Sequence, residues 1–546
     1  MNIFAKEQGI LPENEIGAAL NNLIASLDGD EEKQLLLEKG TYYIDADNCP
    51  ERIFHVTNTT NEKEYDAPEK RGLRRVAVLF ENIKNLTFDG NGSTIVVDGI
   101  CDNVDLIDCE NVTIKNLEIK ARRPNAHKLA IERRTPTSLT LLTDPEDKVT
   151  EENGQIYFLG KDYKYPLMFK GEQKYFNSAD PDRPTYFTRI RHPLFGAKKI
   201  KYADGKITAK GLFLSRRFKV GMEYYLFDNS RKNVGVFAQG CKNLTITNFI
   251  QRFSYSLSIV CQDCENLTFE KLDMSPEDNK RFGICSLSDF VHLCCCRGRI
   301  VVRDSFFSSS GDDVLNVHGV HFKITKASDK EITVRFCHSD AFGYNVFHPG
   351  DVVAFIDKNS LLEQGQNKVV DAKMLDLHSL KLTLESPIDS SCIGQMIENI
   401  SACPDVLFEK NKFERISTRG LLFTTRGKVV VRDNDFIFTK LWSIEIADDA
   451  LDWYESGMVC DATIENNRFI DCTQEIIHIF PHNILHKGYV HNNITIKNNE
   501  FHLRRRICYV VRSAGNVRIS GNKYIAPKFY RQYLLKITSD IAEKDF

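Results

Sequence analysis

The stretch Asn243-Leu244-Thr245-Ile246 returns 23 residues later as Asn266-Leu267-Thr268-Phe269, and this repetition decides the fold. Each copy begins with a polar residue and continues with alternating apolar and polar side chains. Neighbouring copies are 23, 26, 32 or 33 residues apart, so the base period is near 23, with insertions of about ten residues. Further copies begin at Asn85, Asn111, Arg299, Lys428, Asp461, Asn493 and Asn516.

The alternation within each copy has a period of two residues, which is typical of a β-strand. One such unit cannot bury its apolar face alone, so successive units must stack. The pairs Asn466-Asn467, Asn498-Asn499 and Asn411-Lys412 fit turns between short strands, since Asn tolerates a left-handed backbone. A leucine-rich solenoid would need a stricter Leu pattern and a fixed period. The sequence therefore predicts an all-β protein built on a right-handed parallel β-helix.

Two stretches lack the repeated phrase and resemble each other. Each contains a Phe-x-x-Gly motif, at Phe218-Lys-Val-Gly221 and Phe347-His-Pro-Gly350, followed at identical spacing by alternating apolar residues and an Asp. This similarity predicts two copies of one small antiparallel β-barrel. The predicted organisation is an N-terminal cap with the first β-helix coils (1–120), a first inserted barrel (121–239), central coils (240–319), a second inserted barrel (320–400) and C-terminal coils (401–546).

Composition limits the classes of function. The 546 residues carry a net charge of -3 and an isoelectric point near 6.6, which argues against nucleic acid or an anionic membrane as a partner. We find no apolar run long enough to span a membrane and no N-terminal signal, and we expect a cytoplasmic protein unless a signal was removed. Pro12 to Leu27 reads as a short amphipathic helix that caps the solenoid. Whether copies of the chain associate stays open.

Sixteen cysteines could suggest disulfides or zinc. Cys294-Cys295-Cys296 are consecutive, and Cys261 and Cys264 form a single C-x-x-C with no second one at zinc-ribbon spacing. We therefore expect thiols packed inside the coils, as in a reducing compartment, with no metal and no cofactor.

The chemistry concentrates around three carboxylates. Asp289 lies 23 residues after Asn266, and Asp312-Asp313 follow one coil later. Removing the ten-residue insertion makes Asp289 and Asp312 equivalent, so they should be vertical neighbours at about 4.8 Å. Asp313 would then need a turn or bulge at Gly311 to reach the same face. Three converging carboxylates suggest acid–base chemistry at a sugar, because mutual repulsion keeps one of them protonated near neutral pH, or else a cation site.

Other residues are candidates for substrate binding. His318 either hydrogen-bonds Asp312 or Asp313 or is a polar residue at a strand end. Arg426 and Arg419 could grip sugar hydroxyls or balance the carboxylates, and an ordinary surface arginine is the alternative for each. Trp453 could offer an aromatic face to the apolar face of a sugar, with Glu455 holding a hydroxyl, and core packing is the alternative for Trp453.

At this point the chain resembles glycoside hydrolase family 110. The resemblance lies in Gly311-Asp-Asp-x-x-Asn316-Val-His318-Gly319, in the Phe342–Asp351 block, in Arg419-Gly-Leu-Leu … Thr425-Arg426-Gly427, and in Trp453-Tyr-Glu455-Ser-Gly457. It covers nearly the whole chain and adds Asn316 to the substrate-binding candidates. It implies an exo-acting, inverting α-1,3-galactosidase that removes terminal galactose from blood-group B or linear α-galactosyl glycans.

The Asp spacing is also similar to that of the polygalacturonases, which implies Asp312 as the acid and Asp289 with Asp313 as the water-activating pair. Their Gly-His-Gly in the next coil is absent here, which argues against a galacturonate substrate. Two rivals remain. One is a Ca²⁺-dependent polysaccharide lyase, and the other is a glycan-binding adhesin whose carboxylates are incidental.

Overall fold

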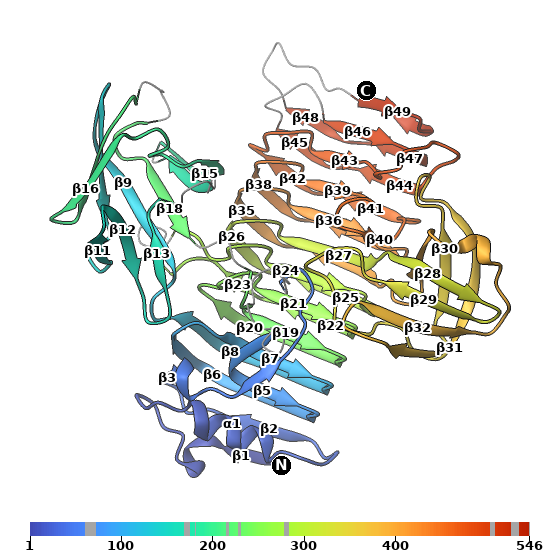
Figure 1. Ribbon diagram of the computed structural model, residues 1–546, viewed down its shortest axis with the longest axis horizontal. Coiled ribbons are helices and arrows are strands. Elements are labelled where there is room, and N and C mark those ends of the chain that lie inside the picture. The colour runs from blue at the N-terminus through green and yellow to red at the C-terminus, as the bar shows by residue number, and fades with distance from the viewer. Residues whose placement is uncertain are drawn as a thin grey trace.

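A computed structural model describes residues 1–59, 72–168, 175–180, 182–213, 218–227, 231–277, 283–502, 508–525 and 534–544. Two long, mainly parallel sheets form the body of the molecule, with 21 and 13 strands among these residues. Figure 1 shows their strands stacked as coils from the N-terminal end to the C-terminal end. The predicted parallel β-helix is therefore confirmed.

The larger sheet carries the repeated phrases on its longer strands. Its members are β1 (Asn2–Phe4), β2 (Lys33–Leu36), β3 (Thr41–Asp45), β6 (Lys84–Asp98), β8 (Glu110–Ala121), β20 (Lys242–Gln251), β22 (Glu265–Glu270), β23 (Asp273–Met274), β25 (Arg297–Arg303), β26 (Phe306–Ser310), β34 (Asp405–Glu409), β35 (Lys412–Ile416), β37 (Val429–Arg432), β38 (Asp435–Thr439), β41 (Ala462–Glu465), β42 (Arg468–Ile470), β44 (His491–Lys497), β45 (Glu500–His502), β47 (Ala514–Ser520), β48 (Lys523–Ile525) and β50 (Ile541–Lys544).

The second sheet bears the carboxylates at its strand starts. Its members are β4 (Glu51–Ile53), β5 (Leu73–Glu81), β7 (Asp102–Ile107), β19 (Val236–Gln239), β21 (Ile259–Gln262), β24 (Val291–Cys294), β27 (Leu315–Val320), β36 (Leu421–Thr424), β39 (Ile444–Ile446), β40 (Glu455–Ser456), β43 (Ile477–Ile479), β46 (Tyr509–Arg512) and β49 (Leu534–Ile537).

The asparagine that begins the phrase has a structural reason. Asn243 and Asn266 adopt φ of 54° and 57°, a left-handed turn that Asn tolerates. Their side chains form a ladder, in which Asn266 donates to Asn243 at 3.1 Å and Asn243 donates to Asn111 at 2.8 Å. The apolar positions that follow, such as Leu267, are fully buried in the continuous core. Each repeat thus pairs with its neighbours through both backbone and side chains.

The prediction of two barrels is only half right. Within the described residues, the first insertion forms an open antiparallel sheet of seven strands in the order β15 (Arg183–Arg191), β14 (Tyr175–Asp180), β18 (Glu223–Phe227), β9 (Ala126–Thr135), β10 (Ser138–Thr143), β17 (Lys206–Lys210) and β16 (Lys199–Ala203). A separate three-stranded sheet contains β11 (Lys148–Glu152), β12 (Gln155–Leu159) and β13 (Lys164–Pro166).

The first insertion stays open because its edge strand packs on the β-helix. Tyr186 of β15 contacts the ring of Phe438 in β38 with centroids 5.2 Å apart, and the Arg415 guanidinium of β35 lies over the Phe187 ring. This edge therefore faces the coils and does not pair with β16. The shared Phe-x-x-Gly motif predicted local similarity, and it did not determine closure.

The second insertion does close into a barrel. Its strands run in the order β28 (Phe322–Ser328), β29 (Glu331–Arg335), β32 (Ser379–Leu384), β31 (Glu363–Met374), β30 (Val352–Ile356) and β33 (Met396–Asn399), and β33 returns to β28. In Figure 1 the barrel and the first insertion project from opposite sides of the β-helix.

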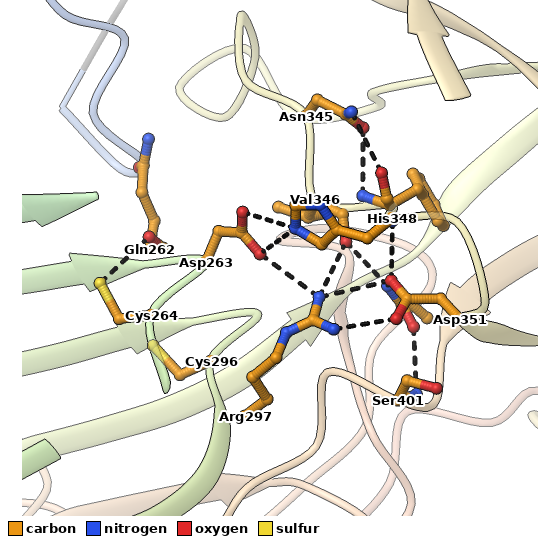
Figure 2. A network of polar contacts seen from close by, with 12 residues as sticks. Gln262, Asp263, Cys264, Cys296, Arg297, Asn345, Val346, His348, Asp351 and Ser401 are labelled. Atoms are coloured by element: carbon orange, nitrogen blue, oxygen red, sulfur yellow. Dashed lines mark hydrogen bonds and ion pairs between the residues drawn. The ribbon is translucent and has the colours of Figure 1, made fainter. Parts of the chain in front are cut away.

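A polar network fastens the barrel to the coils. The Arg297 guanidinium donates to Asp351 of the barrel at 2.9 Å and to Asp263 of a β-helix turn at 3.3 Å. His348 lies 2.8 Å from the same Asp263 carboxylate. Figure 2 shows Arg297 between the two aspartates, with His348 beside Asp263. The barrel is thus held against the β-helix by charge pairs at its base.

The N-terminal cap contains the helix α1 (Gly17–Ala25), whose buried Leu20 and Ile24 extend the apolar core. The sheet begins ahead of this helix, because β1 already pairs with β2. None of the described helices is long and apolar enough to cross a membrane. None of the sixteen cysteines forms a disulfide, and most of them are buried.

Candidate active site

The three candidate carboxylates precede adjacent strands of the second sheet. β24 pairs with β27 in parallel, with Val291 opposite Leu315, an offset of 24 residues. The Asp313 amide donates to the Asp289 carboxylate at 3.3 Å, and the Phe290 amide donates to the Asp313 carbonyl at 2.9 Å. The vertical neighbour of Asp289 is therefore Asp313, and the predicted stacking on Asp312 is wrong by one residue.

A bend brings Asp312 onto the same face. A Cβ added at Gly311 would lie 2.2 Å from the Leu287 carbonyl oxygen, so glycine permits this close approach of two coils. The Ser310 hydroxyl donates to the Asp312 carbonyl and closes the bend. As a result, one carboxylate oxygen from each of Asp289, Asp312 and Asp313 lies within 4.8 Å of the others.

Three arginines surround this carboxylate trio of Asp289, Asp312 and Asp313. Arg231 donates to Asp312 at 3.1 Å, and Arg189 lies 3.6 Å from the same oxygen. Arg419 binds Asp313 through two nitrogens, at 3.0 and 2.8 Å. Arg189 and Arg231 come from the first insertion and the segment that leads back from it. Neither arginine could be identified from the sequence alone, because the residue pattern of an antiparallel insertion does not indicate which of its side chains face the coils.

The neighbouring charges give the three carboxyl groups of the trio different pKa values. Burial would raise the pKa of Asp312, but Arg189, Arg231 and Arg419 outweigh it and hold that pKa below its ordinary value. Burial and the Asp312 charge raise the pKa of Asp289 to about 7. Burial also raises the pKa of Asp313, and the pair with Arg419 opposes that rise. The free site therefore contains an ionised carboxylate beside a carboxyl that is protonated near neutral pH.

His318 does not contact the Asp pair. Its Nε2 lies 2.9 Å from Nε2 of His292, and its Nδ1 lies 2.7 Å from the Gly319 carbonyl. His292 in turn places Nδ1 2.8 Å from the Asp289 carboxylate. His318 therefore reaches the trio through a histidine to which the sequence assigned no role.

Asn316 and Glu455 form a hydrogen-bonded pair beside His318. The Asn316 side chain donates to the Glu455 carboxylate at 3.2 Å, and that carboxylate lies 3.8 Å from His318 Nε2. Glu455 belongs to β40, which pairs antiparallel with the end of β27. Both residues are buried, and they bind each other.

Trp453 borders the site through Arg231. The Arg231 guanidinium lies 5.6 Å from the centre of the Trp453 ring, while the same group binds Asp312. His338 of the barrel stacks on the other side of the ring at 4.3 Å. Since Trp453 is 38% exposed, an edge or face of the indole remains open to a ligand.

Arg426 lies elsewhere. Its guanidinium pairs with Glu363 and Glu398 of the barrel strands β31 and β33. These contacts fasten the barrel to the coil that follows it, so the Arg426 side chain is directed to the barrel and not to the trio.

The spacing of the trio would also suit a divalent cation, which prefers carboxylate oxygens. Three guanidinium groups already balance the three carboxylates, so the donor set offers little net negative charge to hold such an ion. The described site is better suited to acid–base chemistry than to metal binding.

Comparison with known proteins gives a consistent picture. The chain is 30% identical over 481 residues to α-1,3-galactosidase A of Bacteroides thetaiotaomicron, covering 87% of this chain and 82% of that protein. The chain belongs to the α-1,3-galactosidase A/B family, glycoside hydrolase family 110. It is also 27% identical over 530 residues to α-1,3-galactosidase B of Phocaeicola vulgatus, covering 88% of this chain and 84% of that protein.

The domain matches agree with this family 110 assignment. Residues 331–392 match the family described as GLAA-B beta-barrel domain II, and residues 399–524 match the right handed beta helix region. Among solved structures, an exopolygalacturonase from Thermotoga maritima is similar with a TM-score of 0.42 and 11% identity, over 99% of this chain and 92% of that chain.

Proposed function

We propose that this protein is an exo-acting glycoside hydrolase that releases terminal α-1,3-linked galactose from blood-group B type or linear α-galactosyl glycans, with inversion at the anomeric carbon. Membership of family 110 supports the substrate class. One structural observation carries the chemistry, namely that Asp289 and Asp312 lie within 4.8 Å of each other while two arginines pair with Asp312 alone; burial and the Asp312 charge raise the pKa of Asp289 to about 7, and the arginines lower that of Asp312. Glycoside hydrolysis requires this combination of one acid and one ionised carboxylate.

The charges divide the roles within the trio. Asp312 cannot hold a proton easily while Arg189 and Arg231 pair with it, whereas Asp289 has a pKa near the operating pH of a general acid. The proposal gives the acid role to Asp289 and the water-activating role to Asp312, with Asp313, whose pKa is raised by burial, as a hydrogen-bonding group for the same water. This reverses the assignment of Asp312 as the acid that the polygalacturonase-like spacing implied.

Two insertions support an exo-acting site. Arg189 and Arg231 reach Asp312 from the first insertion and its return segment, and His338 of the barrel supports Trp453 from the opposite side. Walls on both sides of the trio favour a site that holds the end of a glycan chain. The guanidinium of Arg231 and the indole of Trp453 supply a donor and an apolar face for one galactose.

The stereochemical course is the sharpest test. The nearest oxygens of the trio lie within 4.8 Å, close to the roughly 5–5.5 Å of retaining pairs and below the roughly 6.5–9.5 Å of inverting ones. Inversion is supported by the family resemblance and predicts that β-galactose appears first in time-resolved NMR of an α-1,3-galactosyl trisaccharide. If α-galactose appears first, the retaining course that the spacing favours replaces it.

The same reaction, run on the branched and linear trisaccharides, tests the function itself. We expect the wild-type protein to release free galactose from these substrates and Asp312→Asn to release none. An unsaturated, calcium-dependent product would instead identify a lyase, and glycan binding without turnover would identify an adhesin.

A further inference from the structure

A buried column of side chains leads away from the trio along the outer face of the second sheet, formed by Asp289, His292 and His318. Three short contacts connect it. Asp289 Oδ2 lies 2.8 Å from His292 Nδ1, His292 Nε2 lies 2.9 Å from His318 Nε2, and His318 Nδ1 lies 2.7 Å from the Gly319 carbonyl oxygen. His292 is fully buried and His318 nearly so. The two rings are therefore shielded from bulk water.

The contacts fix the number of protons. A carbonyl oxygen only accepts, so His318 Nδ1 must carry a hydrogen to bond Gly319. The two facing Nε2 atoms need one hydrogen between them, since otherwise two lone pairs would meet at 2.9 Å. If His292 supplies that hydrogen as a neutral ring, its Nδ1 is bare and Asp289 must be protonated. If His318 supplies it, His318 is a cation, His292 donates from Nδ1, and Asp289 is ionised.

These two states hold the same number of protons. We propose that His292 is a proton relay that couples the protonation of the catalytic carboxyl Asp289 to that of His318, so that the column stores the proton used by the site. The inference rests on the proposed hydrolysis and deepens it. Asp289 and His318 exchange charge through His292, and the Asp289 end of the column meets the reacting glycan.

The transfer is balanced. The O–H bond of Asp289 breaks as an N–H bond forms at His292 Nδ1, and the N–H bond at His292 Nε2 breaks as one forms at His318 Nε2. No group is oxidised or reduced in this transfer. A neutral carboxyl and imidazole become a carboxylate and an imidazolium.

Charged neighbours stabilise both ends. Asp312, Asp313, Arg231, Arg419 and Glu455 surround Asp289. Burial would lower the pKa of His318, but Glu455 and Cys294 outweigh it and raise that pKa. Burial and the neighbouring His318 lower the pKa of His292 well below its ordinary value. A proton therefore rests at either end of the column, and the middle ring only passes it on.

The relay would keep the acid Asp289 protonated. When Asp289 gives its proton to the leaving oxygen, the column lacks one proton, and the bare Nδ1 of His292 faces the Asp289 carboxylate at 2.8 Å. This repulsion favours prompt reprotonation of Asp289 by solvent that enters the glycan site after the product leaves, and it holds Asp289 protonated near neutral pH. Asn316 holds Glu455 beside His318 and so fixes the His318 end of the column.

The test compares pH profiles. In His292→Gln the side-chain amide donates to the Asp289 carboxylate and favours its ionised form. The basic limb of the kcat/KM profile should therefore move to lower pH. At neutral pH kcat should fall about tenfold or more, with KM little changed. The matched control is His321→Gln, because His321 is equally buried and pairs with Asp448 at 2.7 Å, away from the trio. It should lose stability without moving either limb. An unshifted basic limb in His292→Gln overturns the relay.

A second measurement needs no substrate. In ¹⁵N-histidine NMR of the free protein, Asp289→Asn should change the protonation of His318 because Asn cannot accept or release the shared proton. Unchanged His318 resonances would overturn the coupling. If galactose is released but the pH profile and the histidine resonances do not change in these variants, the proposed hydrolysis stands and the proton relay is wrong. If the histidines are coupled but no galactose is released, the relay stands and the proposed hydrolysis is wrong.

Discussion

Arg231 donates a hydrogen bond to Asp312 at 3.1 Å across 81 positions of sequence. This contact joins the segment that leads back from the first insertion to the bend at Gly311, and it helps to keep Asp312 ionised. The first insertion and its return segment thereby help to set the charge of the Asp312 carboxyl group in the site.

Removal of this arginine should shift the acidic limb of the pH profile. In Arg231→Gln the Asp312 carboxylate loses one opposing charge, so its pKa rises. Activity should then be lost at a higher pH on the acidic side, and the basic limb should also move to higher pH, because Arg231 lowers the pKa of Asp289 as well. Arg183→Gln is the control, since Arg183 lies in the same insertion and stacks on Tyr186. The pH dependence of kcat/KM for both variants gives the answer, and equal profiles would contradict the role of Arg231.

The leaving group separates acid from base. Asp289→Asn should reduce hydrolysis of the natural glycan by about 10²–10⁴-fold, and far less for a nitrophenyl α-galactoside, whose leaving group needs no proton. Asp312→Asn should lose activity on both substrates because the attacking water is no longer activated. The reverse pattern would restore Asp312 as the acid. Rates on the two substrates decide the question, with circular dichroism as a check of folding.

Trp453 should contribute to binding rather than to folding. The indole is 38% exposed and is flanked by the Arg231 guanidinium and the stacked His338 ring. Trp453→Ala should raise KM by roughly threefold to tenfold, the loss of about 0.5–1.5 kcal/mol of ring contact, and it should reduce the protection that galactose gives against heat. If KM is unchanged and the melting temperature falls sharply, Trp453 belongs to the core.

Arg426 should matter for the barrel and not for the sugar. Arg426→Ala leaves Glu398, whose side chain is 1% exposed, without its partner, and such a loss costs about 3–5 kcal/mol. We expect faster hydrogen exchange in β31 and β33 and an unchanged KM for the folded fraction. The opposite result, a raised KM with unchanged exchange, would return Arg426 to the substrate site.

The contact of His348 with Asp263 predicts a pH-dependent anchor. The hydrogen bond with Asp263 raises the pKa of His348, although burial opposes it. The stabilisation is therefore full below the unfolded value near 6.5 and is lost as the pH rises through the higher folded value. His348→Gln should lower stability by about 0.2–1 kcal/mol in mildly acidic solution and have little effect in alkaline solution. Thermal unfolding at two pH values measures this difference, and an equal loss at both would argue against the ion pair.

Local patterns in the sequence determined the β-helix. A period-two alternation, repeated about every 23 residues behind an Asn, leaves each unit with one apolar face and a left-handed turn, and stacking is the arrangement that satisfies both. The same repeat placed Asp289 near Asp312 and Asp313, because residues that are about one period apart lie in adjacent coils.

Tertiary structure decided the rest. The register of β24 and β27 is offset by 24 residues and makes Asp313 the neighbour of Asp289, since a bend at one coil adds a residue that a mean period cannot show. Closure of one insertion and not the other depended on whether an edge strand met its partner or the coils. Arg189, Arg231 and His318 acquired their partners through contacts between distant segments, where side-chain direction and charge, rather than sequence spacing, determine which groups meet.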